Sequence, residues 1–280
     1  MFLRTCLSLL SLAACLCADE AYSIRLARPL KAGDRFEVSA KMALDDSTVT
    51  IIDGGEAADD KTVVACRLTG SLTVDAVTTK GQPMDVRLKL KSIECVNDGQ
   101  PAQFFKAGDE LRLRHGKPDN VSEVNGEPAE ELQSEIIEAI LSVQGEGEVT
   151  DDDVFGTADK VKVGAEWPVT PKAAIMDLEA EGVTGLKPEH IKGSTKIAGA
   201  TEVGNQPALL IRAESKIDGK GIGLSKLPES VKATRFYLEM TGEMDVPVDL
   251  QSKDGRAKGL SRLEVDAAGK LEEEGVETSI

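Results

Sequence analysis

Apolar and polar residues alternate with a period of two over much of the chain. From Phe236 to Leu250 the apolar side chains stand at even positions, and only Tyr237 and Pro247 break the rule at odd ones. A helix would spread these side chains over its whole surface, whereas a strand turns them to one face. The segment therefore predicts one long strand with a buried face and a solvated face.

Three segments nearer the N-terminus alternate in the same way and predict further strands. They cover residues 36–44, 64–76 and 86–90. Lys80-Gly81-Gln82 predicts the turn between the last two, because glycine and its polar neighbours favour turns. Centring that turn on the glycine sets Val74 opposite Leu88.

This register brings two cysteines close together. Cys66 falls opposite Val96, one residue from Cys95, and a β-bulge near Gly70 would close that gap. We therefore expect a Cys66–Cys95 disulfide that ties the open end of the hairpin in an oxidising compartment. The alternative is two buried free thiols.

A second hairpin is predicted directly after the long strand. Asp254-Gly255 stands between two alternating segments, which favours a two-residue turn in which both residues adopt positive φ. A turn centred there sets Val246 opposite Leu263 and Met244 opposite Val265. Apolar side chains then meet on one face, which supports the register.

One amphipathic helix interrupts the predicted strands, over residues 128–143. Its apolar positions are Leu132, Ile136, Ile140 and Val143. That spacing places them on one side of a helix. Pro128 suits its first turn, and Gly145 and Gly147 are expected to end it. A second, weaker helix is predicted over Lys172–Glu181.

Two parts of the chain share short sequence features. One segment runs from Gly70-Ser71 to Ile93-Glu94 and the other from Gly193-Ser194 to Ile217-Asp218. From Gln82-Pro83 and Gln206-Pro207 onward the offset is a constant 124 residues. Lys-x-Gly-x-x-aromatic entries precede both, at Lys31–Phe36 and Lys162–Trp167, and Lys106–Asp109 is a third copy without the aromatic residue. Such turns also arise by convergence, but the constant offset favours a duplication.

These features predict an α+β protein that is mainly antiparallel β. We expect long-stranded meander sheets, arranged as a half-barrel or as two packed sheets, a duplicated chain and one main amphipathic helix. The expected domains are a signal peptide at 1–18, an N-terminal β-rich half at 19–127, a helix and connection at 128–145, and a C-terminal β-rich half at 146–280.

The N-terminus has the layout of a bacterial export signal. Arg4 precedes a short apolar run that is too short to span a bilayer, and acidic residues begin at Asp19. Cleavage after Ala18 is one interpretation. The other is cleavage before Cys15, because Leu12-Ala13-Ala14-Cys15 resembles a lipobox and predicts a lipid on the cysteine. The expected location is the periplasm or outer envelope, with a lipid anchor at Cys15 in the second case.

Charge and composition exclude several partners. The formal charge is −16, and removing Arg4 with the leader leaves 32 basic against 49 acidic residues, a charge of −17. Such a field repels phosphate backbones, so nucleic acid is not an expected partner. Aromatic residues make up 3% of the chain, with Trp167 the single tryptophan, which argues against sugar-binding and single-strand-binding surfaces.

Candidate catalytic groups are few. His115 and His190 lie in unrelated segments without zinc-binding spacing. Acidic residues cluster at Asp151–Asp153 and between Asp45 and Asp60, but neither cluster has the Asp-x-Asp-x-Asp-Gly spacing of a calcium loop. We expect no metal, no cofactor and no catalytic residue. A calcium site and a pair of catalytic carboxylates are the alternatives.

Long amphipathic strands in a meander, a helix across them and a bacterial leader resemble the periplasmic lipoprotein-carrier architecture of LolA, LolB and RseB. The resemblance implies a curved sheet that half-wraps a helix around an apolar cavity, and it carries over no binding residue. The Lys162–Trp167 entry and the Gly-x-Gln-Pro hairpins are also similar to exported bacterial β-rich families of unknown function.

Three functions follow as hypotheses. The preferred one is an exported, non-enzymatic envelope protein with a binding or scaffold role. The second is a lipoprotein-carrier-like chaperone, with lipid or an envelope protein as partner, which predicts an apolar pocket. The third is a carboxylate-dependent hydrolase, which predicts convergent carboxylates with shifted pKa values in one cleft.

Overall fold

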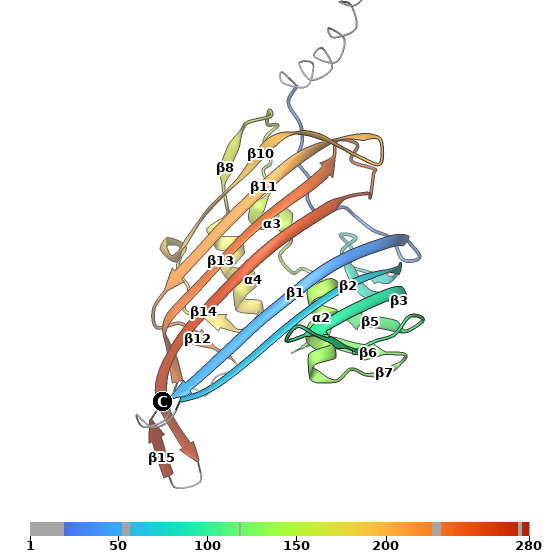
Figure 1. Cartoon of the computed structure of the whole chain (residues 1–280). Helices are drawn as coiled ribbons and strands as arrows, with labels where there is room; N and C mark the ends of the chain where they lie inside the picture. Colours follow the sequence, from blue (N-terminus) through green and yellow to red (C-terminus); the bar gives the residue numbers. More distant parts are fainter. Residues whose placement is uncertain (1–19, 52–56, 118, 226–230, 274–275, 280) are drawn as a thin grey trace, which may run out of the picture. The chain divides into compact units, whose positions relative to one another are not determined.

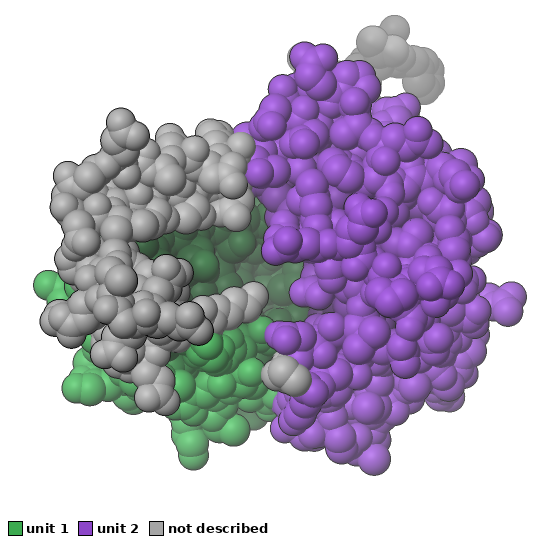
Figure 2. Space-filling view, turned by 90° about the horizontal axis from the view of Figure 1, so that it is seen from below, with its two compact units in different colours: residues 1–28, 149–280 green, residues 29–148 purple. Residues whose placement is uncertain are grey.

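The computed structural model describes residues 20–51, 57–117, 119–225, 231–273 and 276–279. The chain divides into two compact units, coloured separately in Figure 2: unit 2 is 29–148, and unit 1 joins the residues before 29 to 149–280. Each unit contains one main antiparallel sheet of long strands, as the alternation predicted. The predicted leader and Cys15 lie outside the described residues.

The described residues of unit 2 form a seven-stranded antiparallel sheet and one helix (Figure 1). Its elements are β1 (Arg35–Ile51), β2 (Ala57–Val77), β3 (Pro83–Asn97), β4 (Gln100–Ala102), β5 (Glu110–Arg114), β6 (Val121–Val124), β7 (Glu127–Pro128) and α2 (Glu131–Ile140). The strand order is β1-β2-β3-β5-β6-β7, and β4 pairs with β3. Helix α2 buries Ile136 and Ile137 fully against Leu88 and Leu111 of the sheet core.

Helix α2 is shorter than the predicted range 128–143. Pro128 lies in β7 opposite Glu123 and not in the first helical turn. The helix ends before Leu141, and not at Gly145. It ends early because the Gln144 N–H donates to the Pro83 carbonyl (2.8 Å), which holds the following segment extended beside β3.

Unit 1 is built on a six-stranded sheet in the order β15-β14-β13-β11-β10-β8, and Figure 1 shows its long strands side by side. Its elements are α3 (Asp151–Phe155), β8 (Glu166–Pro168), α4 (Pro171–Ala180), β9 (Val183–Thr184), η1 (Pro188–His190), β10 (Ile191–Val203), β11 (Gln206–Gly219), β12 (Gly223–Leu224), β13 (Val231–Pro247), β14 (Arg256–Glu273) and β15 (Val276–Ser279). Strands β9 and β12 form a separate two-stranded sheet. Helix α4 confirms the weaker of the two predicted helices.

The apolar face of the unit 1 sheet is covered at two places. Helices α3 and α4 contribute Val154 and Ala174 to one buried cluster that includes Phe236. Residues 20–28, which we call the N-terminal segment, contribute Tyr22 and others to a second cluster. Burying these side chains is the main stabilising term for a sheet with one apolar face.

Strand β13 confirms the long predicted strand as far as Pro247, and Phe236 and Val246 are buried on its even-numbered face, whereas residues 248–250, which the prediction included, lie in the connection that follows. The predicted hairpin register is wrong: Met244 pairs with Ala257 and not with Val265. The chain leaves β13 after Pro247 and crosses an eight-residue connection, so the Asp-Gly pair falls at the end of that connection. The displacement is an even number of residues, so every side chain keeps its predicted face.

The hairpin of β2 and β3 confirms the predicted disulfide. Val74 pairs with Val86, two residues from the predicted Leu88, and a register shift follows Thr69, as expected near Gly70. Cys66 and Cys95 are then directly opposite and bonded, with S–S 2.06 Å and Cα–Cα 4.2 Å. A disulfide is typical of an oxidising, extracytoplasmic setting.

The three Lys-x-Gly turns dock in the same way. In each turn the glycine has positive φ. Its N–H donates a hydrogen bond to a backbone carbonyl of a neighbouring strand, and the strand that follows the turn pairs with that same neighbour. These bonds are Gly33 to Val74 (2.8 Å), Gly108 to Leu90 (2.9 Å) and Gly164 to Ile197 (2.9 Å). The sequence similarity therefore corresponds to one recurring structural device.

The two units also share a close backbone approach. A Cβ on Gly70 would lie 2.5 Å from the Lys89 carbonyl oxygen, and one on Gly193 would lie 2.2 Å from that of Glu214. Only glycine fits either position without a shift of the opposite strand. Both glycines fall in the segments that the repeat had paired.

Candidate functional site

The polar face of the unit 1 sheet is hollowed over β8, β10, β11, β13 and β14. The hollow has a volume of about 530 Å³, and we call it the charged hollow. Its charged lining residues are Glu166, Lys196, Arg212, Glu214, Glu243 and Lys258. Its other lining residues are Ser194, Ala213, Thr241, Gly242, Gly259 and Leu260.

Strand register places five of these charges in one row. Glu166 stands opposite Lys196, Lys196 opposite Arg212, Arg212 opposite Glu243, and Glu243 opposite Lys258. Residues directly opposite in antiparallel strands lie on the same face with Cβ atoms about 5 Å apart. The row therefore crosses five of the six strands on the polar side of the sheet, from β8 to β14.

Glu243 is the ionic centre of the row. It pairs with Lys258 and accepts a hydrogen bond from Arg212 Nε at 2.7 Å. The Lys258 contact, and then the Arg212 bond, lower the pKa of Glu243 against the opposing effect of partial burial. The carboxylate therefore remains ionised at neutral pH and compensates both cations.

Three other charged side chains of the charged hollow have no ion-pair partner in the described part of the chain. Among the described residues, the side chains of Glu166, Lys196 and Glu214 make no hydrogen bond or ion pair. Leu260, which is 71% exposed, adds apolar surface beside them. The hollow thus offers free charges of both signs around an apolar edge, which suits a polar or dipolar ligand better than an acyl chain.

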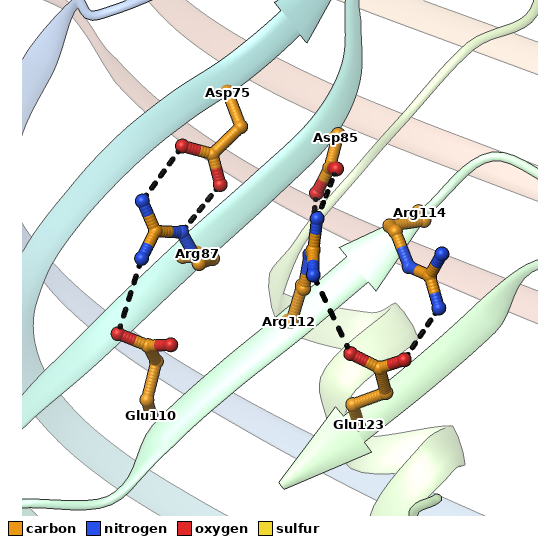
Figure 3. Close-up of polar contacts among 7 residues, drawn as sticks. All are labelled: Asp75, Asp85, Arg87, Glu110, Arg112, Arg114 and Glu123. Carbon is orange, nitrogen blue, oxygen red and sulfur yellow. Dashed lines mark hydrogen bonds and ion pairs between the residues drawn. The ribbon is translucent and has the colours of Figure 1, made fainter. Parts of the chain in front are cut away.

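The polar face of unit 2 carries a network of ion pairs (Figure 3). Its members are Asp75, Asp85, Arg87, Glu110, Arg112, Arg114 and Glu123, from β2, β3, β5 and β6. Arg112 binds Asp85 through Nε (2.9 Å) and Nη2 (2.6 Å), which is the bidentate geometry of strong arginine–carboxylate pairs. Glu123 bridges Arg112 and Arg114.

The network shifts the pKa values of Asp75, Arg87 and Arg112 toward their charged forms. The hydrogen bond from Arg87 lowers the pKa of Asp75, and the same contact raises the pKa of Arg87. The Asp75 carboxylate is therefore held as an anion by the neighbouring cation and is not poised to give or take a proton.

The two histidines do not come together. His115, in unit 2, lies with Nε2 3.4 Å from Glu148 Oε1. His190, in unit 1, accepts the Lys187 N–H at Nδ1 (3.2 Å) at the start of η1. Each has a local structural contact.

The acidic cluster at 151–153 has structural partners. The carboxylate of Asp152 accepts the backbone N–H groups of Leu26 (2.6 Å) and Ala27 (3.2 Å), which ties the N-terminal segment to α3. Asp153 accepts bonds from Thr150 at the helix start. Burial of its carboxyl group beside Asp152 raises the pKa of Asp151, although the residue as a whole is exposed.

The second acidic cluster lies on β1 and β2 and in the residues between them. Asp45 and Asp46 belong to β1, Asp59 and Asp60 to β2, and Asp53 falls outside the described residues. In the part of the chain that the structure describes, no group of three or more histidine, cysteine, aspartate or glutamate side chains could hold a metal ion.

A smaller hollow of about 400 Å³ lies beside the disulfide in unit 2. Cys95, Pro101 and Phe105 are among its lining residues. It contains one carboxylate, Glu94, and one amine, Lys106, so it offers less chemistry than the charged hollow.

The comparisons with known proteins give no match. No protein-family model matches the chain, no curated protein matches it, and no solved structure matches it. The resemblance to lipoprotein carriers therefore stays a prediction. No described helix has the length and apolar character needed to cross a membrane.

Proposed function

We propose that the chain is an exported, non-enzymatic protein of the bacterial envelope that acts by binding, with the charged hollow as its binding site. The N-terminal leader pattern supports export, and the Cys66–Cys95 disulfide supports an oxidising compartment. The binding partner is expected to be polar, because free charges of both signs line the hollow.

The observation that carries this proposal is the pairing of acids with bases across strands on both polar faces. Glu239 pairs with Lys216 at 2.8 Å and Glu243 with Arg212 and Lys258 in unit 1, and the seven-residue network does the same in unit 2. These contacts lower the pKa values of Glu239 and Glu243. A general acid needs the opposite shift, so these carboxylates suit recognition better than catalysis.

Two further functions keep specific support. The carrier hypothesis is favoured by the half-buried Leu238, Met240 and Met244 and by Leu263, which is 60% exposed, on the apolar face of β13 and β14. It is disfavoured in unit 2, where α2 packs directly on the sheet and leaves Ile136 and Ile137 no exposed surface. Within the charged hollow, the hydrolase hypothesis would use Glu166 and Glu214, the two carboxylates there without an ion pair.

Native mass spectrometry of the protein purified from its own envelope tests the proposal. We expect a non-covalently bound polar species that is lost in Lys196→Glu and retained in Lys192→Glu. Lys192 is an exposed lysine of the same strand outside the hollow, so it is a matched control. Loss of the bound species in both variants, or no bound species at all, contradicts the assignment of the hollow.

Two assays separate the other functions. Saturable binding of a fluorescent fatty acid that is abolished by Met240→Lys and kept by Thr241→Lys, its neighbour on the opposite face, would establish the carrier hypothesis instead. Turnover of fluorogenic esters or glycosides that disappears in Glu166→Gln and Glu214→Gln would establish a hydrolase.

A further inference from the structure

Over positions 256–266, one edge of strand β14 has no partner strand among the described residues. Within the described residues, positions 256–266 pair with β13 alone, and β15 pairs only with positions 270–273. Every residue from Arg256 to Leu263 is exposed, and Leu260 and Leu263 are 71% and 60% exposed. A long exposed edge with apolar side chains is a template for pairing with another strand.

The polar face of this edge is complementary to itself. Arg256, Lys258 and Glu264 share that face with Asp266, since their β13 partners are polar-face residues. If a second copy pairs antiparallel about Ser261, Arg256 stands opposite Asp266 of the other copy. Lys258 then stands opposite Glu264. Symmetry repeats each pair, so four opposite-charge contacts form across the junction.

The apolar face is complementary in the same register. Ala257 stands opposite Val265 of the other copy, and Gly259 stands opposite Leu263. The glycine leaves room for the exposed leucine, which is otherwise without cover. Pairing therefore removes apolar surface from water on one face while it joins charges on the other.

Neighbouring registers are excluded by charge and by face. A shift of one residue sets the polar face of one strand against the apolar face of the other. A shift of two residues sets Lys258 opposite Arg262 in one direction, and Arg262 opposite its own copy in the other. Like charges directly opposite destabilise a strand pair, so the register about Ser261 is favoured over those shifted by two residues.

We propose that β14 is a self-association edge: two copies of the chain pair β14 to β14, antiparallel about Ser261, and form one continuous sheet. The proposal goes beyond the proposed function, since it identifies a second copy of the chain as partner. The overall charge of −17 opposes association, but charges more than about 8–10 Å apart are screened at physiological salt. Positions 256–266 themselves carry three basic and two acidic residues.

The expected dimer is weak. Pairing of one strand from each copy buries less than the roughly 1,600 Å² of a standard interface. We therefore expect half-dissociation at a concentration on the order of micromolar. Sedimentation velocity of the mature chain, from Asp19 onward, over a range from well below to well above that concentration should show the monomer convert to a dimer.

Cross-linking tests the register. Directly opposite residues in antiparallel strands have Cα atoms about 4.5–5.5 Å apart, which a disulfide can span. Ser261→Cys should therefore form a disulfide-linked dimer under mild oxidation, because residue 261 faces its own copy. Thr241→Cys, exposed on the adjacent β13, should not.

Charge exchange tests the contacts without a new cysteine. Arg256→Asp and Asp266→Arg should each weaken the dimer at least tenfold, and the double exchange should restore it to within about threefold of the natural chain. Lys192→Asp makes the same charge change as Arg256→Asp on β10 and should leave the dimer unaffected. A monomer at every concentration, a dimer insensitive to these exchanges, or equal cross-linking at 241 and 261 would overturn the proposal.

Discussion

The Cys66–Cys95 disulfide offers the sharpest quantitative prediction. The two cysteines are 29 residues apart and only 5% and 8% exposed. Cross-linking a loop of that length lowers the entropy of the unfolded chain, and the loop-closure relation gives about 3.6 kcal/mol of stabilisation at 25 °C. That is a large share of the 5–15 kcal/mol typical of a folded domain.

Replacing both cysteines, as Cys66→Ala with Cys95→Ala, should therefore lower the free energy of unfolding by about 3–4 kcal/mol. Equilibrium urea unfolding, followed by circular dichroism, measures this loss. With a urea dependence of about 2 kcal/mol/M, the midpoint should fall by nearly 2 M. Trp167, the single tryptophan, lies in unit 1, so its fluorescence reports the unfolding of the unit that lacks the disulfide. The urea midpoint measured by fluorescence should therefore shift less than the midpoint measured by circular dichroism.

Two results would refute this reasoning. One is a loss below about 1 kcal/mol, which would mean that the cross-link does not constrain the unfolded chain as loop closure requires. The other is the titration of two free thiols in the natural chain after unfolding without reductant. As a control, reduction of the natural chain should reproduce most of the loss seen in the double variant.

Three further predictions concern single residues. Gly193→Ala should lower the free energy of unfolding in urea by about 1–3 kcal/mol, because the new Cβ would lie 2.2 Å from a carbonyl oxygen of β11. As a control, Gly199→Ala should change the free energy of unfolding by less than about 0.5 kcal/mol, because its Cβ would have nothing within 4 Å. Equal effects of the two substitutions would contradict the close approach at Gly193. Asp152→Asn should speed hydrogen exchange of the N-terminal segment with little change elsewhere, and unchanged exchange there would show that the carboxylate does not anchor it. The pKa of Glu243 is lowered in the folded state, so the stabilisation by its carboxylate is present above the ordinary pKa of 4.5 and is lost as the pH falls below that value. The difference in unfolding free energy between the natural chain and Glu243→Gln should therefore shrink in acid. A difference that stays constant with pH would contradict the ion pairs of Glu243.

The strands and the faces of their side chains were predictable because successive side chains of a strand point to opposite faces, so that odd and even positions separate. Phe236 and Val246 are buried whatever strand lies beside them, and the wrong hairpin register left their faces unchanged. Registers depend on turn length and on bulges. The Asp254-Gly255 signal did not reveal that β13 ends seven residues earlier, at Pro247.

The charged hollow could not be predicted from the sequence. Lys196, Arg212, Glu243 and Lys258 are ordinary outward residues of four strands, and the same alternation is typical of any solvated sheet face. Only the correct registers bring them into one row. The hairpin register predicted from the sequence would place Lys258 eight residues away from Glu243 along β13, so that prediction does not bring the two side chains together. By contrast, the disulfide was predictable because a single bulge near Gly70 left few positions for Cys95.

We propose that the protein works outside the cytoplasm as an oxidised, processed chain. Its intact mass, measured on material purified from the bacterial envelope, tests this most directly. We expect the mass of residues 19–280 less two hydrogen atoms, or that of a lipid-bearing chain that begins at Cys15 with the same two hydrogens missing. The unprocessed mass of residues 1–280 with all thiols reduced would contradict it.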